Sequence, residues 1–213
     1  MSLKIICTTS NAYLHIIPVF EYLYKKYWND ANIEIIGYEK PVTSLPFVSL
    51  GIQGGVKEWS TDLRRYFESI PDKWIIWIME DTLLRSQVNM PLFRDLPLQE
   101  GIGKICLTSD VSKREHTNDG YLVHASPTSR YRLSMQPSIW NRNYLLQYLA
   151  DGMDPWTAET QDPKNDGWDV VGFVNPPVVH NEGVTRHDIF KLNLTGMCDE
   201  DAQAIKMLAP WMK

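Results

Sequence analysis

An unbroken apolar run from Trp74 to Met79 is the feature that most constrains what this chain can fold into. A short run that is apolar on both faces is typical of a strand at the centre of a helix-covered sheet. It is far shorter than the roughly 20 residues needed to cross a bilayer. Glu80 and Asp81 follow it directly. The sequence therefore predicts a buried central strand that ends in two carboxylates.

Strand-like and helix-like segments alternate along the 213 residues. Short apolar runs predict strands at Lys4–Cys7 and Ile33–Ile36, and the apolar spacing between Pro18 and Tyr27 predicts a helix. Further helices are expected at 60–70, 139–149 and from 199, and further strands at 104–108, 169–174 and 178–179. Alternation of this kind predicts a single α/β domain over residues 1–213, with a central mixed, mostly parallel sheet flanked by helices.

The composition excludes some classes of protein. Lys and Arg number 21 against 26 Asp and Glu, a net charge of -5, whereas a nucleic-acid binder normally carries an excess of positive charge. Three widely separated cysteines show neither metal-ligand spacing nor a disulfide framework. With no apolar leader and no transmembrane run, we expect a soluble protein in a reducing intracellular compartment such as the cytoplasm.

The acidic pair suggests a chemistry. Ligands of α/β sheets collect at the carboxyl ends of the strands, which is where Glu80 and Asp81 are expected to lie. Carboxylate oxygens there suit Mg²⁺ or Mn²⁺, and such an ion can neutralise a diphosphate leaving group. The alternative is a solvated strand end in which Asp81 caps the following turn.

Two later segments add to this pattern. Ser134 to Trp140 contains Met-Gln-Pro-x-x-Trp, predicted to open a helix, and Asp154 to Glu159 contains Pro-Trp-x-x-Glu. In this order after a strand with an acidic end, the motifs resemble a nucleotide-sugar glycosyltransferase of the GT-A type. The resemblance runs from Lys4 to about His180 and is particularly close to the small glycosyltransferase domains that large algal (chlorella) viruses encode for capsid-protein glycosylation.

The resemblance implies a metal-dependent transferase that moves a sugar from a UDP-sugar donor to a glycan acceptor hydroxyl, with retention of configuration. Asp81 would contact Mn²⁺ or Mg²⁺ directly, Glu80 would support the metal or the ribose, and His180 would be a further ligand. The sequence departs from the usual Asp-x-Asp motif of the family, since Met79 precedes Glu80 and Asp81. That departure leaves open which carboxylate binds the metal.

The resemblance also places the nucleotide on the first strand and its loop, at Thr8, Thr9, Ser10 and Asn11. Taken alone, without the resemblance, these residues are better explained as a polar turn.

Two aromatic residues are candidates for the rim of the nucleotide site. Tyr38 could stack on the base or be an ordinary rim residue. Trp59 is expected near the nucleotide, or else packs on the helix that follows it.

Catalytic roles follow from the same resemblance. Asp81 would act through the metal, and Gln136 would lie close to the reacting carbon of the sugar. Glu159 would orient hydroxyls in a retaining enzyme or serve as general base in an inverting one. Trp140 and Trp156 are candidates for packing on sugar faces, with Trp140 alternatively in the core.

Other readings remain open. A nucleotidyltransferase would share the sheet and the metal, but it would need a Gly-rich, cationic triphosphate loop after the first strand, which residues 8–11 do not provide. A non-catalytic carbohydrate-binding module would explain the aromatic residues but not the acidic pair. We expect a nucleotide-binding half at about residues 1–108 and an acceptor half at about 109–213, in a chain that could be one module of a longer polypeptide.

Overall fold

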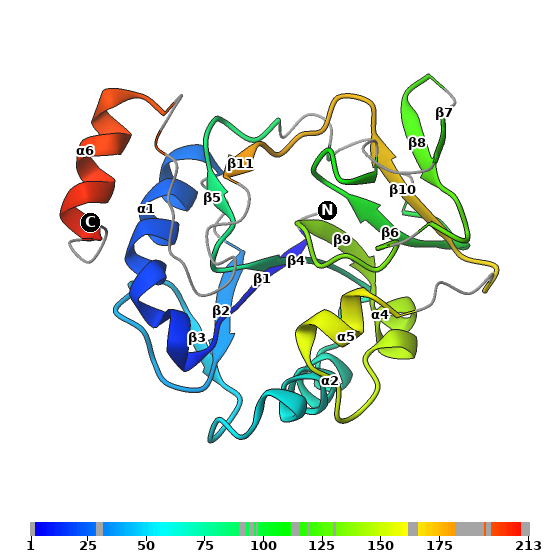
Figure 1. The fold of residues 1–213 in the computed structure, drawn as a ribbon, viewed down its shortest axis with the longest axis horizontal. Helices are drawn as coiled ribbons and strands as arrows, with labels where there is room; N and C mark the ends of the chain where they lie inside the picture. Colours follow the sequence, from blue (N-terminus) through cyan, green and yellow to red (C-terminus); the bar gives the residue numbers. More distant parts are fainter. Residues whose placement is uncertain are drawn as a thin grey trace.

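The computed structural model describes residues 3–28, 32–89, 93, 96, 98–111, 116–118, 120–129, 131–161, 166–181, 194 and 197–209. Within this part of the chain, one sheet has the strand order β3-β2-β1-β4-β9-β6-β10-β8-β7, and β11 pairs with β5 in a small second sheet (Figure 1). The strands are β1 Lys4–Thr8, β2 Ile33–Gly37, β3 Phe47–Ser49, β4 Trp74–Met79, β5 Leu83–Leu84, β6 Ile102–Cys106, β7 His116–Asn118, β8 Leu122–Ala125, β9 Ser138–Asn141, β10 Asp169–Phe173 and β11 His180–Asn181.

Strands β8 and β9 run opposite to the rest of the described main sheet. Strand β1 lies between β2 and β4 and is parallel to both. Strand β9 lies between β4 and β6 and is antiparallel to both, so β4 and β6 point the same way. The predicted fold class, a mixed and mostly parallel sheet, is confirmed.

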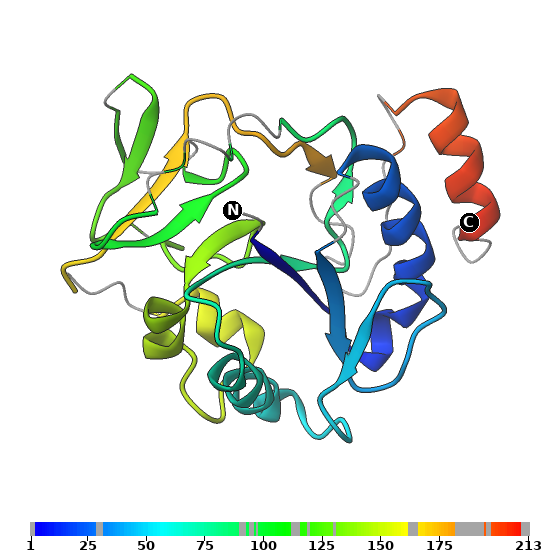
Figure 2. The same ribbon diagram turned by 180° about the vertical axis from the view of Figure 1, so that it is seen from behind.

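Helices cover both faces of this sheet (Figures 1 and 2). Strand residues alternate in direction, so Ile5, Ile76 and Ile78 join the core under α1, whereas Ile75 and Trp77 join the core under α2, α4 and α5. The helices are α1 Ile17–Tyr27, α2 Trp59–Ser69, α4 Arg142–Tyr148, α5 Pro155–Glu159 and α6 Asp199–Leu208, with 3-10 turns η1 Asn11–Ile16 and η2 Val56–Glu58. No helix among the described residues combines the length and apolarity that a membrane span needs.

The last helix, α6, is fastened to α1 by a buried carboxylate. Asp201 is completely buried and accepts hydrogen bonds from Tyr22 Oη at 3.0 Å, from Lys26 Nζ at 2.7 Å and from Tyr27 Oη. Hydrogen bonds and a cation together compensate the charge, as a buried carboxylate requires. The contact therefore joins residues far apart in sequence on the α1 face.

The helix predicted over residues 139–149 is wrong in its first part. Ser138–Asn141 is strand β9, and α4 starts at Arg142, where Asn141 Oδ1 accepts a hydrogen bond from Asn143 N at 3.0 Å. The apolar spacing of the helix continues backwards through Ile139, but a β-branched residue followed by Trp140 also suits the centre of a sheet. Tertiary pairing with β4 and β6 decides between the two.

Two details of the helices add to the predicted elements. Residues 155–159 form the short helix α5, and Asp154 followed by Pro155 is an ordinary helix start. Helix α2 begins at Trp59, one residue before the predicted start. The Ser60 hydroxyl donates to Ala150 O at 2.7 Å and accepts from Met153 N at 2.8 Å, which ties α2 to the segment leading into α5.

Candidate functional site

Several chain segments converge at the carboxyl edge of β1, β4 and β6. Thr8 and Met79, the last residues of β1 and β4, are paired in the sheet. Because β9 is antiparallel, its first residue, Ser138, pairs with Trp77 and Cys106 near the ends of β4 and β6. Residues 134–136, which precede β9, therefore lie at the same edge as the acidic pair after β4. This is the edge at which α/β sheets bind their ligands.

The two carboxylates after β4 lie in a turn, which Thr82 N closes by donating a hydrogen bond to Met79 O at 2.9 Å. Glu80 is 7% exposed. Its burial raises the pKa of its carboxyl well above the usual range, and the neighbouring Asp81 charge adds to this.

The Cys7 thiol lies within electrostatic reach of both carboxylates, Glu80 and Asp81. Burial raises the pKa of the Cys7 thiol, and the charges of Glu80 and then Asp81 raise it further. Two adjacent carboxylates at this edge are ligands of the kind that Mg²⁺ or Mn²⁺ takes.

Glu159 ends α5, on the side of the sheet where Ala158 joins the core under α2, α4 and α5. Its carboxylate accepts a hydrogen bond from Met135 N at 2.6 Å, which joins α5 to the segment before β9. Burial raises the Glu159 pKa, the Met135 hydrogen bond and Lys104 lower it, and Asp110 and Asp81 raise it. Glu159 is thus within electrostatic reach of Asp81, and its role toward the sugars stays a prediction.

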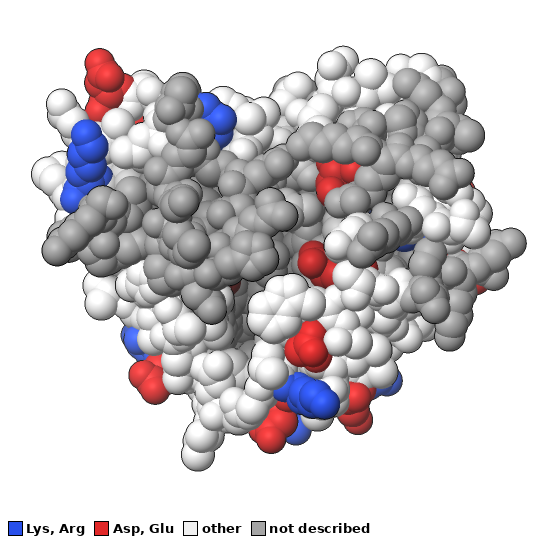
Figure 3. Space-filling view, viewed as in Figure 1, with Lys and Arg blue, Asp and Glu red and all other residues white. Residues whose placement is uncertain are grey.

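Residues Lys104, Asp110 and Ser134 complete this cluster and were not predicted as site residues. The Lys104 ammonium donates to Ser134 O, and the Ser134 hydroxyl donates to Asp110 Oδ2. A sequence signal for Lys104 did exist, because a lysine inside the otherwise apolar Ile102–Cys106 strand is a charge in a buried position. Figure 3 shows acidic side chains inside the hollow at the middle of one face of the molecule.

Gln136 lies two residues before β9 and is partly exposed. Its carbonyl accepts a hydrogen bond from Ser138 Oγ at 2.7 Å, while the adjacent Met135 N is held by Glu159. The backbone on both sides of Gln136 is therefore anchored at the carboxyl edge. Its role near the sugar stays a prediction.

The loop after β1 is tightly bound into the protein. The Thr8 hydroxyl accepts a hydrogen bond from Trp77 Nε1 at 3.1 Å, and both Thr8 and Thr9 are buried. Thr9 packs so closely on Gly37 that a Cβ there would lie 2.9 Å from Thr9 Cγ2 and Thr9 O. Ser10 O accepts from Tyr13 N at 3.0 Å, which starts η1. The loop is rigidly placed, and its contact with a nucleotide stays a prediction.

Asn11 links this loop to two others. Its backbone N donates to Gln53 Oε1 at 2.9 Å, its Nδ2 donates to Glu39 Oε1 at 2.9 Å, and its Oδ1 accepts from Glu39 N at 3.1 Å.

The two predicted aromatic contacts of the nucleotide are largely packed within the protein. Tyr38 is 7% exposed, so it offers little ring surface to a base, and its hydroxyl donates to Asp62 Oδ2 at 3.0 Å. Burial, together with Asp62, raises its pKa. Trp59, partly exposed, stacks on Trp77 with ring centroids 6.2 Å apart.

The predicted metal ligands lie on neighbouring elements. His180 in β11 pairs with Leu84 in β5, and β5 begins two residues after Asp81. Among the described residues, no three His, Cys, Asp or Glu side chains are grouped closely enough to hold a metal by themselves. The acidic pair still fits Mg²⁺ or Mn²⁺, because Mg²⁺ is commonly held by one or two carboxylates with phosphate oxygens and water. His180 as a ligand stays a prediction.

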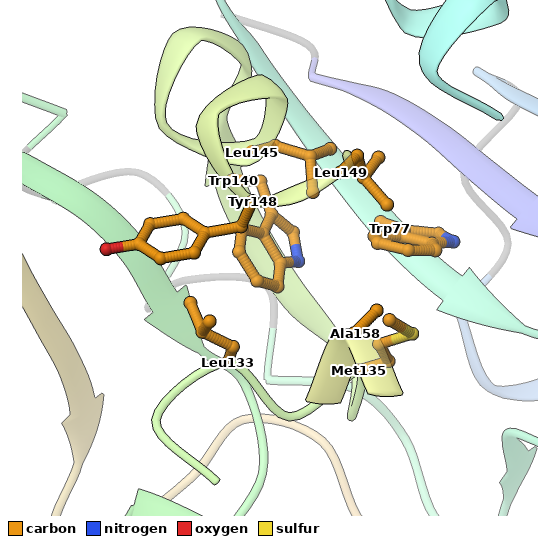
Figure 4. Close-up of a pocket in the computed structure, with 8 residues that line it drawn as sticks. All are labelled: Trp77, Leu133, Met135, Trp140, Leu145, Tyr148, Leu149 and Ala158. Atoms are coloured by element: carbon orange, nitrogen blue, oxygen red, sulfur yellow. The ribbon is translucent and has the colours of Figure 1, made fainter. Parts of the chain in front are cut away.

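A small apolar gap lies beneath the site, between β4, β9, α4 and α5 (Figure 4). Its free volume of about 10 Å³ has room for one water at most, which is far too small for a sugar. Trp140 lines it and is 2% exposed, so this tryptophan belongs to the core and does not offer a face to a ligand. The residues around the gap are Trp77, Leu133, Met135, Trp140, Leu145, Tyr148, Leu149 and Ala158.

Comparison with known proteins gives a likeness of fold. No protein-family model and no curated protein sequence matches the chain. Among similar solved structures, the galactosyltransferase LgtC in complex with donor and acceptor sugar analogs is 10% identical, with a TM-score of 0.42 over 68% of this chain and 60% of that one. The chain thus spans less than two thirds of LgtC.

Two nucleotide-using proteins match over more of their length. A cytidylyltransferase from Leptospira borgpetersenii is 10% identical, with a TM-score of 0.45 over 97% of this chain and 94% of that one. The CMP:2-keto-3-deoxy-manno-octonic acid synthetase complexed with CTP is 11% identical, with a TM-score of 0.50 over 84% of this chain and 91% of that one. At this identity the likeness to the synthetase shows that the α/β fold is shared.

Proposed function

We propose that this protein is a metal-dependent glycosyltransferase that moves a sugar from a UDP-sugar to a glycan acceptor hydroxyl, with retention of configuration. The observation that carries the proposal is that Asp81 and Asp110, from two other segments, lie within electrostatic reach of Glu159 near the carboxyl edge of the sheet. Glu80, next to Asp81, is buried. Acidic groups at this edge suit a reaction in which a cation and a diphosphate meet.

The acidic pair would hold the metal. Asp81, supported by Glu80, would bind Mn²⁺ or Mg²⁺, which when present neutralises the UDP diphosphate as its bond to the sugar breaks. Residues 8–11 would bind the nucleotide at the adjoining edge, with Tyr38 and Trp59 at the rim. The rigid packing of this loop supports that role, because a preformed site loses less entropy when a ligand binds.

Glu159 and Gln136 would face the sugars. Met135 N–H holds one Glu159 oxygen, so the carboxylate is oriented before substrate arrives. From that position it orients a donor or acceptor hydroxyl in a retaining reaction, and in an inverting reaction it would accept the acceptor proton. The Gln136 amide would lie near the reacting carbon.

Trp156 provides a surface for the acceptor glycan. It is 67% exposed and lies three residues before Glu159 on α5. An exposed indole offers a flat apolar face with a polar N–H edge, which suits the face of a sugar ring. We propose that the acceptor approaches over α5; a viral capsid glycoprotein as acceptor follows from the sequence resemblance.

A nucleotidyltransferase is the second candidate, because a synthetase complexed with CTP is among the similar structures, with a TM-score of 0.50. A triphosphate carries more negative charge than a diphosphate and calls for cationic side chains near the first strand. Residues 8–11 are Thr, Thr, Ser and Asn, none of them cationic. The loop therefore favours the nucleotide-sugar proposal.

The test is a panel of donors with Mn²⁺ present. Slow hydrolysis of at least one UDP-sugar, with no pyrophosphate released from CTP or UTP plus a sugar phosphate, is the expected result. Pyrophosphate release without UDP-sugar hydrolysis would establish the second candidate instead. Binding of glycans with neither reaction would indicate a carbohydrate-binding module.

A further inference from the structure

Lys104 is a lysine at the centre of the sheet. It is completely buried in β6 and is paired with Trp140 of β9. A buried ammonium group is costly unless it is compensated. Its Nζ donates to Ser134 O and lies 4.8 Å from the centroid of the Trp140 ring. Neither partner carries a full negative charge.

The compensating charges lie one contact further away. The Ser134 hydroxyl donates to Asp110, and the neighbouring Met135 N donates to Glu159 at 2.6 Å. In the described part of the chain, no carboxylate forms a direct ion pair with Lys104. One cation and two anions are thus all hydrogen-bonded to residues 134 and 135.

We propose that Lys104 is a positioning residue: its ammonium holds residues 134–136 against β6 and keeps Glu159 as the carboxylate that faces the substrate. The role of Glu159 rests on the proposed function, but the arrangement itself does not. The charged groups that act on Glu159 are Lys104 from β6, Asp110 from the loop after β6, and Asp81 from the end of β4. Among the described residues that act on Glu159, Lys104 is the cation, so its removal leaves the negative charges of Asp110 and Asp81 uncompensated.

The test uses the full chain without any nucleotide. The carboxyl of Glu159 is followed by ¹³C NMR as a function of pH and is assigned by the signal that Glu159→Gln removes. In Lys104→Met we expect the midpoint of this titration to move to higher pH, because the cation that favours the charged form is gone. Lys73→Met, which removes an exposed lysine, is the matched control and should leave the midpoint in place.

A Lys104→Gln variant separates charge from hydrogen bonding, since glutamine is neutral but can still donate to Ser134 O. It should show the same upward movement, and an unchanged midpoint in either folded variant would overturn the proposal. Should neither variant fold, Asp110→Asn carries the test: it should move the midpoint to lower pH, and no movement would contradict the coupled arrangement.

The kinetics of donor hydrolysis provide a second measurement, which a purely structural role of Lys104 would leave unchanged. In donor hydrolysis, Lys104→Met should lower kcat about tenfold or more while leaving the donor KM within about threefold, because misplacing a group near the chemistry affects the transition state more than ground-state binding. An unchanged kcat would overturn the positioning role. If the wild type hydrolyses no donor, the proposed function fails, whereas the NMR result still decides the arrangement around Lys104.

Discussion

Replacing Asp81 with asparagine is expected to lower donor hydrolysis and transfer by about 10²–10³-fold, and to remove the stimulation by Mn²⁺. Asparagine keeps the size of the side chain but loses the charge that would hold the ion. A metal contributes several kcal/mol to stabilising the leaving group, and about 1.4 kcal/mol corresponds to a tenfold change in rate. The measurement is the rate of UDP release as a function of Mn²⁺ concentration.

Asp151→Asn is the matched control, because Asp151 is exposed in the turn after α4 and lies outside the proposed site. It should retain the full rate. If Asp81→Asn also stays within about twofold of the wild type, the assignment of Asp81 to the metal is wrong. Preserved folding of both variants, checked by circular dichroism, makes the comparison valid.

The second large effect is expected for Glu159→Gln, which should reduce kcat/KM by about 10²–10⁴-fold if Glu159 transfers a proton. Glutamine keeps an oxygen that can accept from Met135 N, so the segment before β9 should stay in place. A loss smaller than about 10²-fold would indicate that Glu159 orients hydroxyls rather than moves a proton.

The pH dependence of the activity provides a second test of Glu159. Burial raises the Glu159 pKa, so activity that needs the carboxylate should fall as the pH drops through that raised value. Glu159→Gln should lose this acidic limb, whereas Glu100→Gln, at an exposed position, should keep it. A variant Glu159→Gln with the wild-type rate and the wild-type acidic limb would remove Glu159 from the mechanism.

The parts of the fold predicted correctly depend on local patterns. The run from Trp74 to Met79 is apolar on both faces and indeed forms β4 beside β1. The helical spacing after Pro18 is confirmed as α1. The failure at Ser138–Asn141 has a different origin, because a segment with both helical spacing and strand-forming residues is decided by its partners, β4 and β6, which lie far away in sequence.

In the candidate site, too, local sequence patterns predict some residues, whereas contacts between distant segments determine others. Glu80 and Asp81 could be placed at the sheet edge because they follow a recognisable strand. The contact of Glu159 with Met135 N spans 24 residues, and that of Lys104 with Ser134 O spans 30, so both depend on how β9 enters the sheet. Tyr38 illustrates a further limit, since its position after β2 was predicted but its burial against Asp62 was not.

Calorimetric titration with UDP, GDP and CMP, each with and without Mn²⁺, tests the central claim most directly. The proposal that a UDP-sugar binds at the carboxyl edge through the acidic pair predicts that UDP binds more tightly than GDP and CMP. It also predicts that Mn²⁺ tightens UDP binding about tenfold or more, equivalent to about 1.4 kcal/mol. Equal binding of all three nucleotides, or binding of none, would contradict the proposal.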